Sequence, residues 1–368
     1  MFDVAVVGAG VVGLAIARTY AGSGASVVLL ERQPGPGREQ STHNSGVVHS
    51  GAFTRPGTVR AWLAVEGNRR MYDEAPRLGV AIERCGTLMV AQHDADLPRL
   101  WEYQRWATAN QVEGVRLLEP AEARDIEPSL GACTAGLLAP SGGRVDAEGL
   151  VRALDEEAVR LGVERRFDFD LASAHRGEAG WELSTRLGDS VASRGVVNAA
   201  GVRAGRVAAL LGAPNHRIYP CLGEYARIVG EKRSWLRTMV YGFPPPGYPG
   251  IGVHLTRTTR GEVLVGPTAT YQESFEAPAL ATTPLSTFAA LADAYLPGIT
   301  ERDLETVPAG VRAKLVPPGS GDAFGEYEIG EDPEGSGAVH LLGVESPGLT
   351  ASFAIAEFVR EHWPVPSR

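Results

Sequence analysis

A glycine-rich turn between two short apolar segments constrains the fold of this chain more than any other feature. Residues 4–7 form an apolar, mostly β-branched run, and three glycines follow in the spacing G-x-G-x-x-G. Residues 11–20 have the length and apolar periodicity of a helix, and residues 26–30 form a second apolar run. This order predicts a buried parallel strand, a tight turn, a helix and a second strand. It is the setting in which this glycine spacing marks a dinucleotide-binding site.

The three glycines and the end of the second strand predict which residues hold the dinucleotide. Gly8 permits the tight turn, Gly10 lets the backbone approach a pyrophosphate, and Gly13 lets the helix pack closely on the strand. The helix N-terminus offers free N–H groups and a positive dipole end to the phosphates. Glu31 follows the second strand where a carboxylate binds ribose hydroxyls, and we include its neighbour Arg32 in the predicted site.

Length, charge and cysteine content narrow the class of protein. A chain of 368 residues is long for one hydrophobic core, so we expect two lobes. The net charge of −9 argues against a nucleic-acid partner. The three cysteines show no metal-binding spacing, so we expect no metal site and a reducing compartment. With no signal peptide and no membrane-spanning run in the sequence, we expect a cytoplasmic protein; peripheral attachment to a membrane is left open.

Two stretches beyond the glycine turn also suggest contact with a cofactor. Residues 41–51 are polar and contain glycine, and Thr42, Asn44 and Ser45 could donate to a phosphate or to the edge of a flavin ring. An ordinary capped loop is the alternative interpretation. Residues 195–201 form a hydrophobic strand that ends in small residues, where backbone passes close to a cofactor. That strand favours a flavin-type fold over a plain nicotinamide-binding one.

The second half of the chain alternates polar and apolar residues in the manner of an antiparallel sheet. Residues 252–257 and 261–266 predict a hairpin, and residues 308–314 predict another extended segment. One face of this sheet would cover the cofactor. At the C-terminus, a strand over residues 339–343 precedes a helix over residues 351–362, whose N-terminus could stabilise negative charge on a reduced flavin.

Taken together, these stretches resemble the D-amino-acid oxidase superfamily of FAD enzymes, and within it the L-2-hydroxyglutarate dehydrogenase/oxidase family. The resemblance covers nearly the whole chain and rests on residues 43–51, 85–91, 140–145, 223–225, 252–257 and 308–313. The chain departs from that family over residues 278–305, which form a shorter stretch here, and in the turn over residues 345–350. It also has Lys314 where the family usually has Gln.

The resemblance implies the fold class and the domains. We expect an α/β fold in which a Rossmann-like FAD-binding domain carries a second, α+β lobe with an antiparallel sheet for the substrate. The FAD-binding domain would be discontinuous and comprise residues 1–80, 141–215 and 333–368. The substrate domain would comprise residues 81–140 and 216–332.

The resemblance also implies that FAD binds in an extended pose. Its adenine end would lie at the glycine turn and Glu31, with backbone contacts from Leu171. The middle of the cofactor would be lined by Ala199, Ala200 and Gly201. The isoalloxazine ring would lie against Ser45, Gly46, Gly348, Leu349 and Thr350.

Oxidation of a 2-hydroxy acid needs a base, a cation for the carboxylate, and an α-carbon that faces flavin N5 for hydride transfer. His254 is the candidate base, because it lies in the hairpin that should cover the ring and an imidazole titrates in the right range. His49 is the alternative base, or it packs against FAD. Arg312 is the candidate carboxylate ligand, because a guanidinium can donate two parallel hydrogen bonds. A structural histidine or a surface ion pair are the ordinary alternatives.

Several other polar residues could belong to the substrate pocket. Lys314 shares a strand face with Arg312 and could bind a second carboxylate, lie near the flavin, or be solvated. Tyr241, Tyr225 and Glu224 could line the pocket or pack beside it. Arg257 could bind a distal carboxylate, although a solvated hairpin arginine is the simpler interpretation.

We therefore predict an FAD-dependent enzyme that oxidises a small 2-hydroxy acid, with L-2-hydroxyglutarate as first guess and 2-oxoglutarate as product. An amine or amino-acid oxidase of the same fold is the closest alternative, and a redox-inactive dinucleotide-binding subunit is an alternative of another class. Glycerol 3-phosphate is less favoured because no basic cluster for a phosphate is visible. Oxygen, a quinone or a carrier protein could accept the electrons, and the handedness of the substrate and the oligomeric state stay open.

Overall fold

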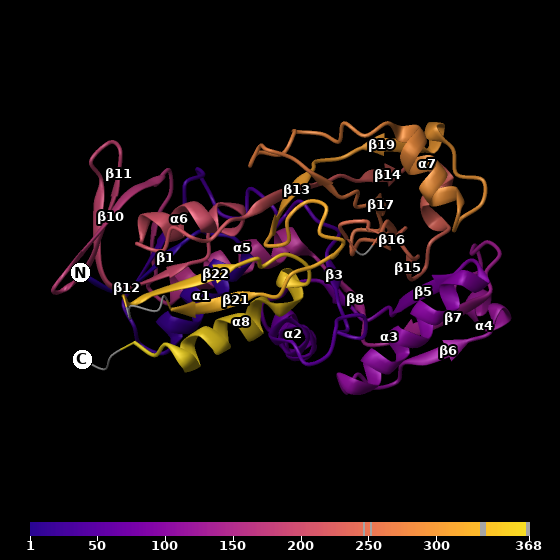
Figure 1. Ribbon diagram of the computed structural model, residues 1–368, viewed down its shortest axis with the longest axis horizontal. Helices are drawn as coiled ribbons and strands as arrows, with labels where there is room; N and C mark the ends of the chain where they lie inside the picture. Colours follow the sequence, from indigo (N-terminus) through magenta and orange to yellow (C-terminus); the bar gives the residue numbers. More distant parts are fainter. Residues whose placement is uncertain (246, 251, 332–335, 366–368) are drawn as a thin grey trace.

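The glycine-rich turn follows a central strand of a large sheet, and this sheet forms one end of an elongated molecule (Figure 1). The computed structural model describes residues 1–245, 247–250, 252–331 and 336–365. The centre of this sheet is parallel, in the order β9 (Glu164–Arg166), β2 (Val27–Leu30), β1 (Phe2–Val7), β12 (Ser190–Asn198) and β22 (Ala338–Leu342). Three strands extend it in antiparallel fashion: β10 (Leu171–Gly177), β11 (Gly180–Thr185) and β21 (Glu328–Glu331).

Helices cover both faces of this sheet because its central strands are apolar on both sides. Val4 and Val6 of β1 pack in one buried cluster with helices α1 (Val11–Gly22), α5 (Ala147–Arg160) and α8 (Gly348–His362). Ala5 and Val7 face the opposite way, toward α6 (Ala204–Leu210). Helix α2 (Val59–Arg77) packs on the outside of α8. The period of two along β1 therefore places the glycine turn between two helical layers.

The other end of the molecule is built on a second large sheet. Its strands run in the order β19 (Leu304–Thr306), β14 (Ala226–Ile228), β17 (Val263–Gly266), β16 (His254–Arg257), β15 (Met239–Tyr241), β5 (Thr87–Ala91), β7 (Ala135–Ala139) and β6 (Arg116–Leu118). Helix α7 (Leu285–Asp293) covers one face and α3 (Leu97–Ala109) the other, and α4 (Pro120–Ile126) packs near β7.

Two small sheets lie between the large ones. One consists of β18 (Thr270–Tyr271), β13 (Tyr219–Gly223) and β20 (Gly310–Lys314), and the other of β3 (Val47–Val48), β8 (Gly143–Val145) and β4 (Ile82–Glu83). Short 3-10 turns complete the described chain: η1 (Asp94–Asp96), η2 (Gly201–Arg203), η3 (Gly230–Ser234) and η4 (Glu301–Asp303).

The predicted α/β architecture is confirmed, with one correction to the second lobe. The expected hairpin is present as β16 and β17, which pair antiparallel. The second sheet is nevertheless mixed, because β15 and β5 pair in parallel. The division into domains stays a prediction; β21, which we expected in the substrate domain, pairs with β22 in the first sheet.

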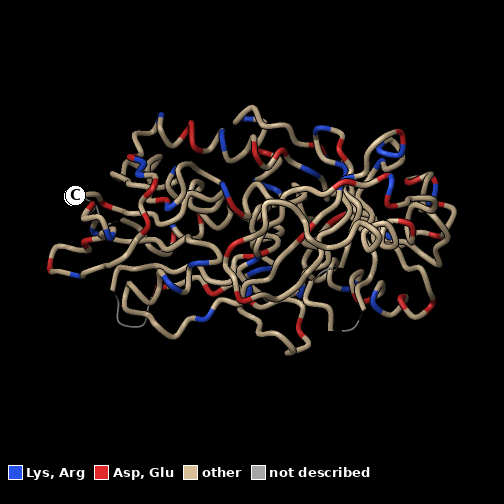
Figure 2. Tube along the Cα trace, turned by 90° about the horizontal axis from the view of Figure 1, so that it is seen from above, with Lys and Arg blue, Asp and Glu red and all other residues tan. Residues whose placement is uncertain are grey.

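Acidic and basic residues are interspersed along both ends of the molecule (Figure 2). This mixture, with the net charge of −9, leaves no strongly basic lobe for a polyanion. Across the described residues, every helix is too short or too polar to cross a lipid bilayer.

Candidate active site

An elongated cavity runs from the glycine turn to the β16–β17 hairpin, and both lobes contribute to its wall. The first lobe supplies the glycine turn, the end of β2, the end of β12 and the turn before α8. The second supplies Tyr225, His254 and Arg312, with Tyr248 from the loop before β16. Residues far apart in the sequence therefore meet along one continuous space.

Side chains at the three glycines of the turn would collide with neighbouring protein atoms. Gly8 has a φ of +107°, and a Cβ there would lie 2.5 Å from the carbonyl oxygen of Ala199. A Cβ at Gly13 would lie only 1.9 Å from the carbonyl oxygen of Gly8, while one at Gly10 would lie 2.9 Å from Ser41 Oγ. Gly8 and Gly10 line the cavity, whereas Gly13 packs behind it. This tight packing keeps the backbone of the turn bare where it lines the cavity, and bare backbone is what a pyrophosphate needs to bind there.

The carboxylate of Glu31 is held against the glycine turn. It accepts hydrogen bonds from the backbone N–H groups of Ala9 and Gln33, each at 2.8 Å. Burial raises the pKa of Glu31, although these two hydrogen bonds oppose the rise. The carboxylate lines the cavity at the predicted position for a ribose hydroxyl pair.

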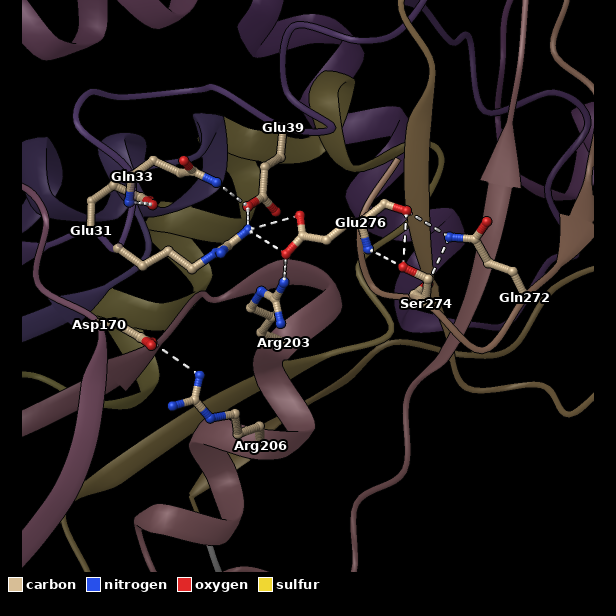
Figure 3. A network of polar contacts seen from close by, with 10 residues as sticks. Glu31, Gln33, Glu39, Asp170, Arg203, Arg206, Gln272, Ser274 and Glu276 are labelled. Atoms are coloured by element: carbon tan, nitrogen blue, oxygen red, sulfur yellow. Dashed lines mark hydrogen bonds and ion pairs between the residues drawn. The ribbon is translucent and has the colours of Figure 1, made fainter. Parts of the chain in front are cut away.

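A network of ion pairs surrounds this end of the cavity (Figure 3). Arg32 pairs with Glu39 and lies 3.3 Å from Glu276, which comes from the second lobe and also pairs with Arg203. Arg206 pairs with Asp170 and donates to the carbonyl oxygen of Leu171, in each case at 3.0 Å. Leu171 lines the cavity together with the three small residues at the end of β12: Ala199, Ala200 and Gly201.

The polar loop after β2 contributes to the cavity in part. Ser45 and Asn44 line it, and Asn44 also braces the loop by donating to the carbonyl oxygen of Ser41 at 2.8 Å. Thr42 instead donates to the carbonyl oxygen of Gly37 at 2.5 Å and does not line the cavity. Gly46 also lies outside the lining residues. Its φ is +66°, and its carbonyl oxygen accepts from the backbone N–H of Val145 at 2.8 Å.

The far end of the cavity holds His254. Its ring stacks on Tyr241, with centroids 4.2 Å apart and an interplanar angle of 10°, and its Nε2 lies 3.3 Å from Ser45 Oγ. Burial lowers the pKa of His254 to about 3, and the neighbouring His49 lowers it further in the same direction. This pKa lies well below the usual imidazole range that made histidine the candidate base, so that expectation is corrected here. The imidazole is neutral near pH 7 and keeps a nitrogen lone pair free for a proton. Tyr241 supports this ring and does not line the cavity.

Arg312 enters the same end of the cavity from β20. Its Nη2 donates to the carbonyl oxygen of Thr268 at 3.0 Å, and its Nη1 to that of Leu222 at 3.4 Å. No Asp or Glu within the described chain forms an ion pair with this guanidinium. Its Nη1 also lies 3.9 Å from Cys221 Sγ. A partly buried positive charge held by carbonyl oxygens and a thiol is suited to an incoming carboxylate.

His49 and the turn before α8 close the end of the cavity. His49 Nε2 lies 3.1 Å from Ser346 Oγ, and the His49 backbone N–H donates to Thr350 Oγ1 at 3.0 Å. Burial and the charge of Arg60 lower the pKa of His49 to about 4. Gly348 and Leu349 line the cavity, whereas Thr350 lies behind them.

Of the four remaining candidates, Tyr225 lines the cavity and the other three lie outside it. Lys314 is fully buried and paired with Glu345, so it is neither solvated nor free for a second substrate carboxylate. Glu224 accepts from Thr282 and Thr283 and anchors that loop. Arg257 stays outside the lining residues, whereas Tyr225 is buried and lines the cavity.

Sequence reasoning missed several lining residues. Ser41 Oγ accepts from the backbone N–H of Val11 at 2.9 Å and so caps the first turn of α1. Its position at the start of the polar stretch was the signal that could have identified it. Tyr248 lies in a proline- and glycine-rich loop without periodicity, and Arg203 and Arg206 lie just beyond the predicted small residues, so nothing local marked them.

Comparison with known proteins identifies the family to which this chain belongs. A family model described as DAO, FAD dependent oxidoreductase, matches residues 3–362. The L-2-hydroxyglutarate dehydrogenase of Escherichia coli (strain K12) is 26% identical over 397 residues, which cover 98% of this chain and 92% of the relative. The mitochondrial L-2-hydroxyglutarate dehydrogenase of Arabidopsis thaliana is 30% identical over 411 residues, which cover 97% of this chain and 82% of the relative.

Solved structures show the same fold. The L-alpha-glycerophosphate oxidase of Mycoplasma pneumoniae, solved in a dithionite-reduced form with FAD bound, matches with a TM-score of 0.88 at 23% identity, covering 100% of this chain and 96% of that one. The glycine oxidase of Geobacillus kaustophilus matches with a TM-score of 0.85 at 23% identity, and the match covers 98% of this chain and 94% of that one. At this identity the likeness concerns the fold alone.

Proposed function

This chain belongs to the family of FAD-dependent oxidoreductases (DAO), as its sequence predicted, and we propose that it oxidises a small 2-hydroxy acid. The first compound to test is L-2-hydroxyglutarate, with 2-oxoglutarate as its product, because relatives that match nearly the whole chain carry that name. The observation that carries the proposal is that His254 and Arg312 line the same end of the cavity. One is a neutral imidazole and the other a guanidinium without a carboxylate partner.

The glycine-turn end of the cavity would hold the adenosine and pyrophosphate of FAD. Backbone N–H groups at the start of α1 would bind the phosphates, and Glu31 would accept hydrogen bonds from the ribose. Ser45, Gly348 and Leu349 would contact the isoalloxazine ring. When bound, FAD supplies the acceptor for the hydride that leaves the substrate α-carbon.

The protein's own residues would position the substrate and handle its proton. Arg312 would bind the substrate carboxylate with parallel hydrogen bonds, since carbonyl oxygens already orient its guanidinium. His254 would accept the hydroxyl proton at Nε2, the ring nitrogen beside Ser45, while the stacked Tyr241 keeps the ring plane fixed. Tyr225 and Tyr248 would help to exclude water from this end of the cavity.

Oxidation of an amine or amino acid is the alternative. The same guanidinium would bind the carboxylate of an amino acid, and a glycine oxidase shares the fold. His254 distinguishes the two, because removal of a hydroxyl proton requires a base, whereas an amine can react in its neutral form. We also propose a cytoplasmic location, and an acceptor of electrons that is oxygen, a quinone or a carrier protein.

The test is an anaerobic absorbance titration of the purified yellow protein with L- and D-2-hydroxyglutarate, glycine, L-proline and glycerol 3-phosphate. Bleaching of the flavin bands by the L-hydroxy acid, with formation of 2-oxoglutarate, is the expected result. Bleaching by an amino acid alone would replace the proposed activity with oxidation of an amine. A bleaching response only to glycerol 3-phosphate would refute the proposed carboxylate site at Arg312.

A further inference from the structure

A fully buried ion pair lies in the cavity wall. Lys314 Nζ lies 2.8 and 3.0 Å from the two carboxylate oxygens of Glu345, and the side chains are 0% and 1% exposed. The ammonium also donates to the carbonyl oxygen of Ala323 at 2.8 Å and lies 4.9 Å from the ring centroid of Phe324. Glu345 lines the cavity, whereas Lys314 lies behind it. Lys314 therefore reaches the cavity through two neighbours that line it, the carboxylate of Glu345 and the ring of Phe324.

The backbone around Glu345 is held as firmly as its side chain. Its carbonyl oxygen accepts from the hydroxyl of Tyr327 at 2.9 Å and from the backbone N–H of Gly348 at 2.6 Å. Arg60 donates to the carbonyl oxygen of the next residue, Ser346. These bonds fix the turn from which α8 begins, and that turn lines the end of the cavity expected to hold the isoalloxazine ring.

A lone carboxylate at this position would oppose the chemistry of the family. Reduction of a flavin adds negative charge to the ring, and an unpaired anion in a low-dielectric wall would disfavour that charge. A buried carboxylate is also costly unless a cation neutralises it. The lysine at position 314, where the resembling family usually has Gln, supplies that cation to Glu345.

We propose that Lys314 is a positioning residue that raises the reduction potential of bound FAD by neutralising and holding Glu345. This inference rests on FAD binding and not on the identity of the substrate. It assigns the ion pair a role in tuning the cofactor rather than in binding a second substrate carboxylate.

The test measures the FAD reduction potential of the holoenzyme by reductive titration against a reference dye, without substrate. Lys314→Met leaves Glu345 unpaired, so the equilibrium constant for two-electron reduction should fall about tenfold, which is about 30 mV. Glu345→Gln leaves the ammonium unpaired, so that constant should rise by a similar factor. The double variant should return to within about threefold of the parent, because neither charge remains.

The opposite signs of the two single variants separate an electrostatic role from simple damage to the wall. Lys232→Met is the matched control: it removes the chain's other lysine, which pairs with Asp303 at 2.8 Å away from the cavity, and should leave the potential unchanged.

Two outcomes would overturn the proposal. In the first, both single variants shift the potential in the same direction. In the second, Glu345→Gln, which keeps the shape of the wall, leaves the potential unchanged. Neither outcome bears on the proposed 2-hydroxy acid, since substrate bleaching is measured separately.

Discussion

Replacement of Gly13 by alanine tests the glycine turn most directly. The new Cβ would lie 1.9 Å from the carbonyl oxygen of Gly8, so backbone would have to move by more than an ångström. Gly8 has little room to move. Its N–H donates to the carbonyl oxygen of Leu30 at 2.7 Å, and its Cβ position would lie 2.5 Å from the carbonyl oxygen of Ala199. Overpacking of this kind costs about 3 kcal/mol, which corresponds to a fall of about 4 °C in Tm for a chain of this size. FAD affinity should fall at least about tenfold, since the displaced turn forms the pyrophosphate site.

Gly22→Ala is the matched control on the same helix. A Cβ at Gly22 meets nothing within 4 Å, and the position is exposed at the end of α1. Alanine there should stabilise the protein by about 0.5 to 1 kcal/mol, because glycine is the poorer helix former. Tm would be followed in the apoprotein by circular dichroism, and FAD affinity by quenching of FAD fluorescence. A Gly13→Ala protein with the Tm and FAD affinity of the parent would refute the reasoning.

Three further predictions concern the substrate end of the cavity. His254→Gln should slow flavin reduction, measured by stopped flow, by at least about 100-fold while FAD stays bound, because it removes the base. If His49→Gln slows reduction more than His254→Gln does, His49 is the base and His254 is not. Because burial lowers the pKa of His254 to about 3, the reduction rate should stay constant from pH 8 to pH 5 and be lost as pH falls through about 3. A midpoint near pH 6.5 in the pH profile of the reduction rate would contradict the lowered pKa. Arg312→Lys should raise the substrate KM by about 10- to 100-fold through loss of one charge-assisted hydrogen bond, and an unchanged KM in steady-state assays would exclude Arg312 as the carboxylate ligand.

The structure assigns two of the candidate residues a different role from the one that the sequence predicted. Tyr241 and Lys314 were candidates for the substrate pocket, yet both are buried and act through a neighbour, His254 in one case and Glu345 in the other. Their neighbours come from other strands or from a turn about 30 residues away. Local periodicity indicates which residues share a face of a strand, but it contains no information about what packs against that face.

What the sequence alone determined about this protein is mostly local. The glycine spacing, the apolar runs around it and the carboxylate at Glu31 follow from steric limits on one short strand–turn–helix unit, so pattern and chemistry are enough to predict them. The hairpin that carries His254 and the strand that carries Arg312 were also visible as local alternation.

Only the tertiary structure decided which of these elements meet. The distances between His254, Ser45 and the turn before α8 depend on how two large sheets pack around one cavity. Whether a charge is free or paired depends on the same packing: Arg312 faces carbonyl oxygens, while Lys314, two residues later, faces a carboxylate. Burial and charge pairing are sums over neighbours distant in sequence, and they exist only once the chain has folded.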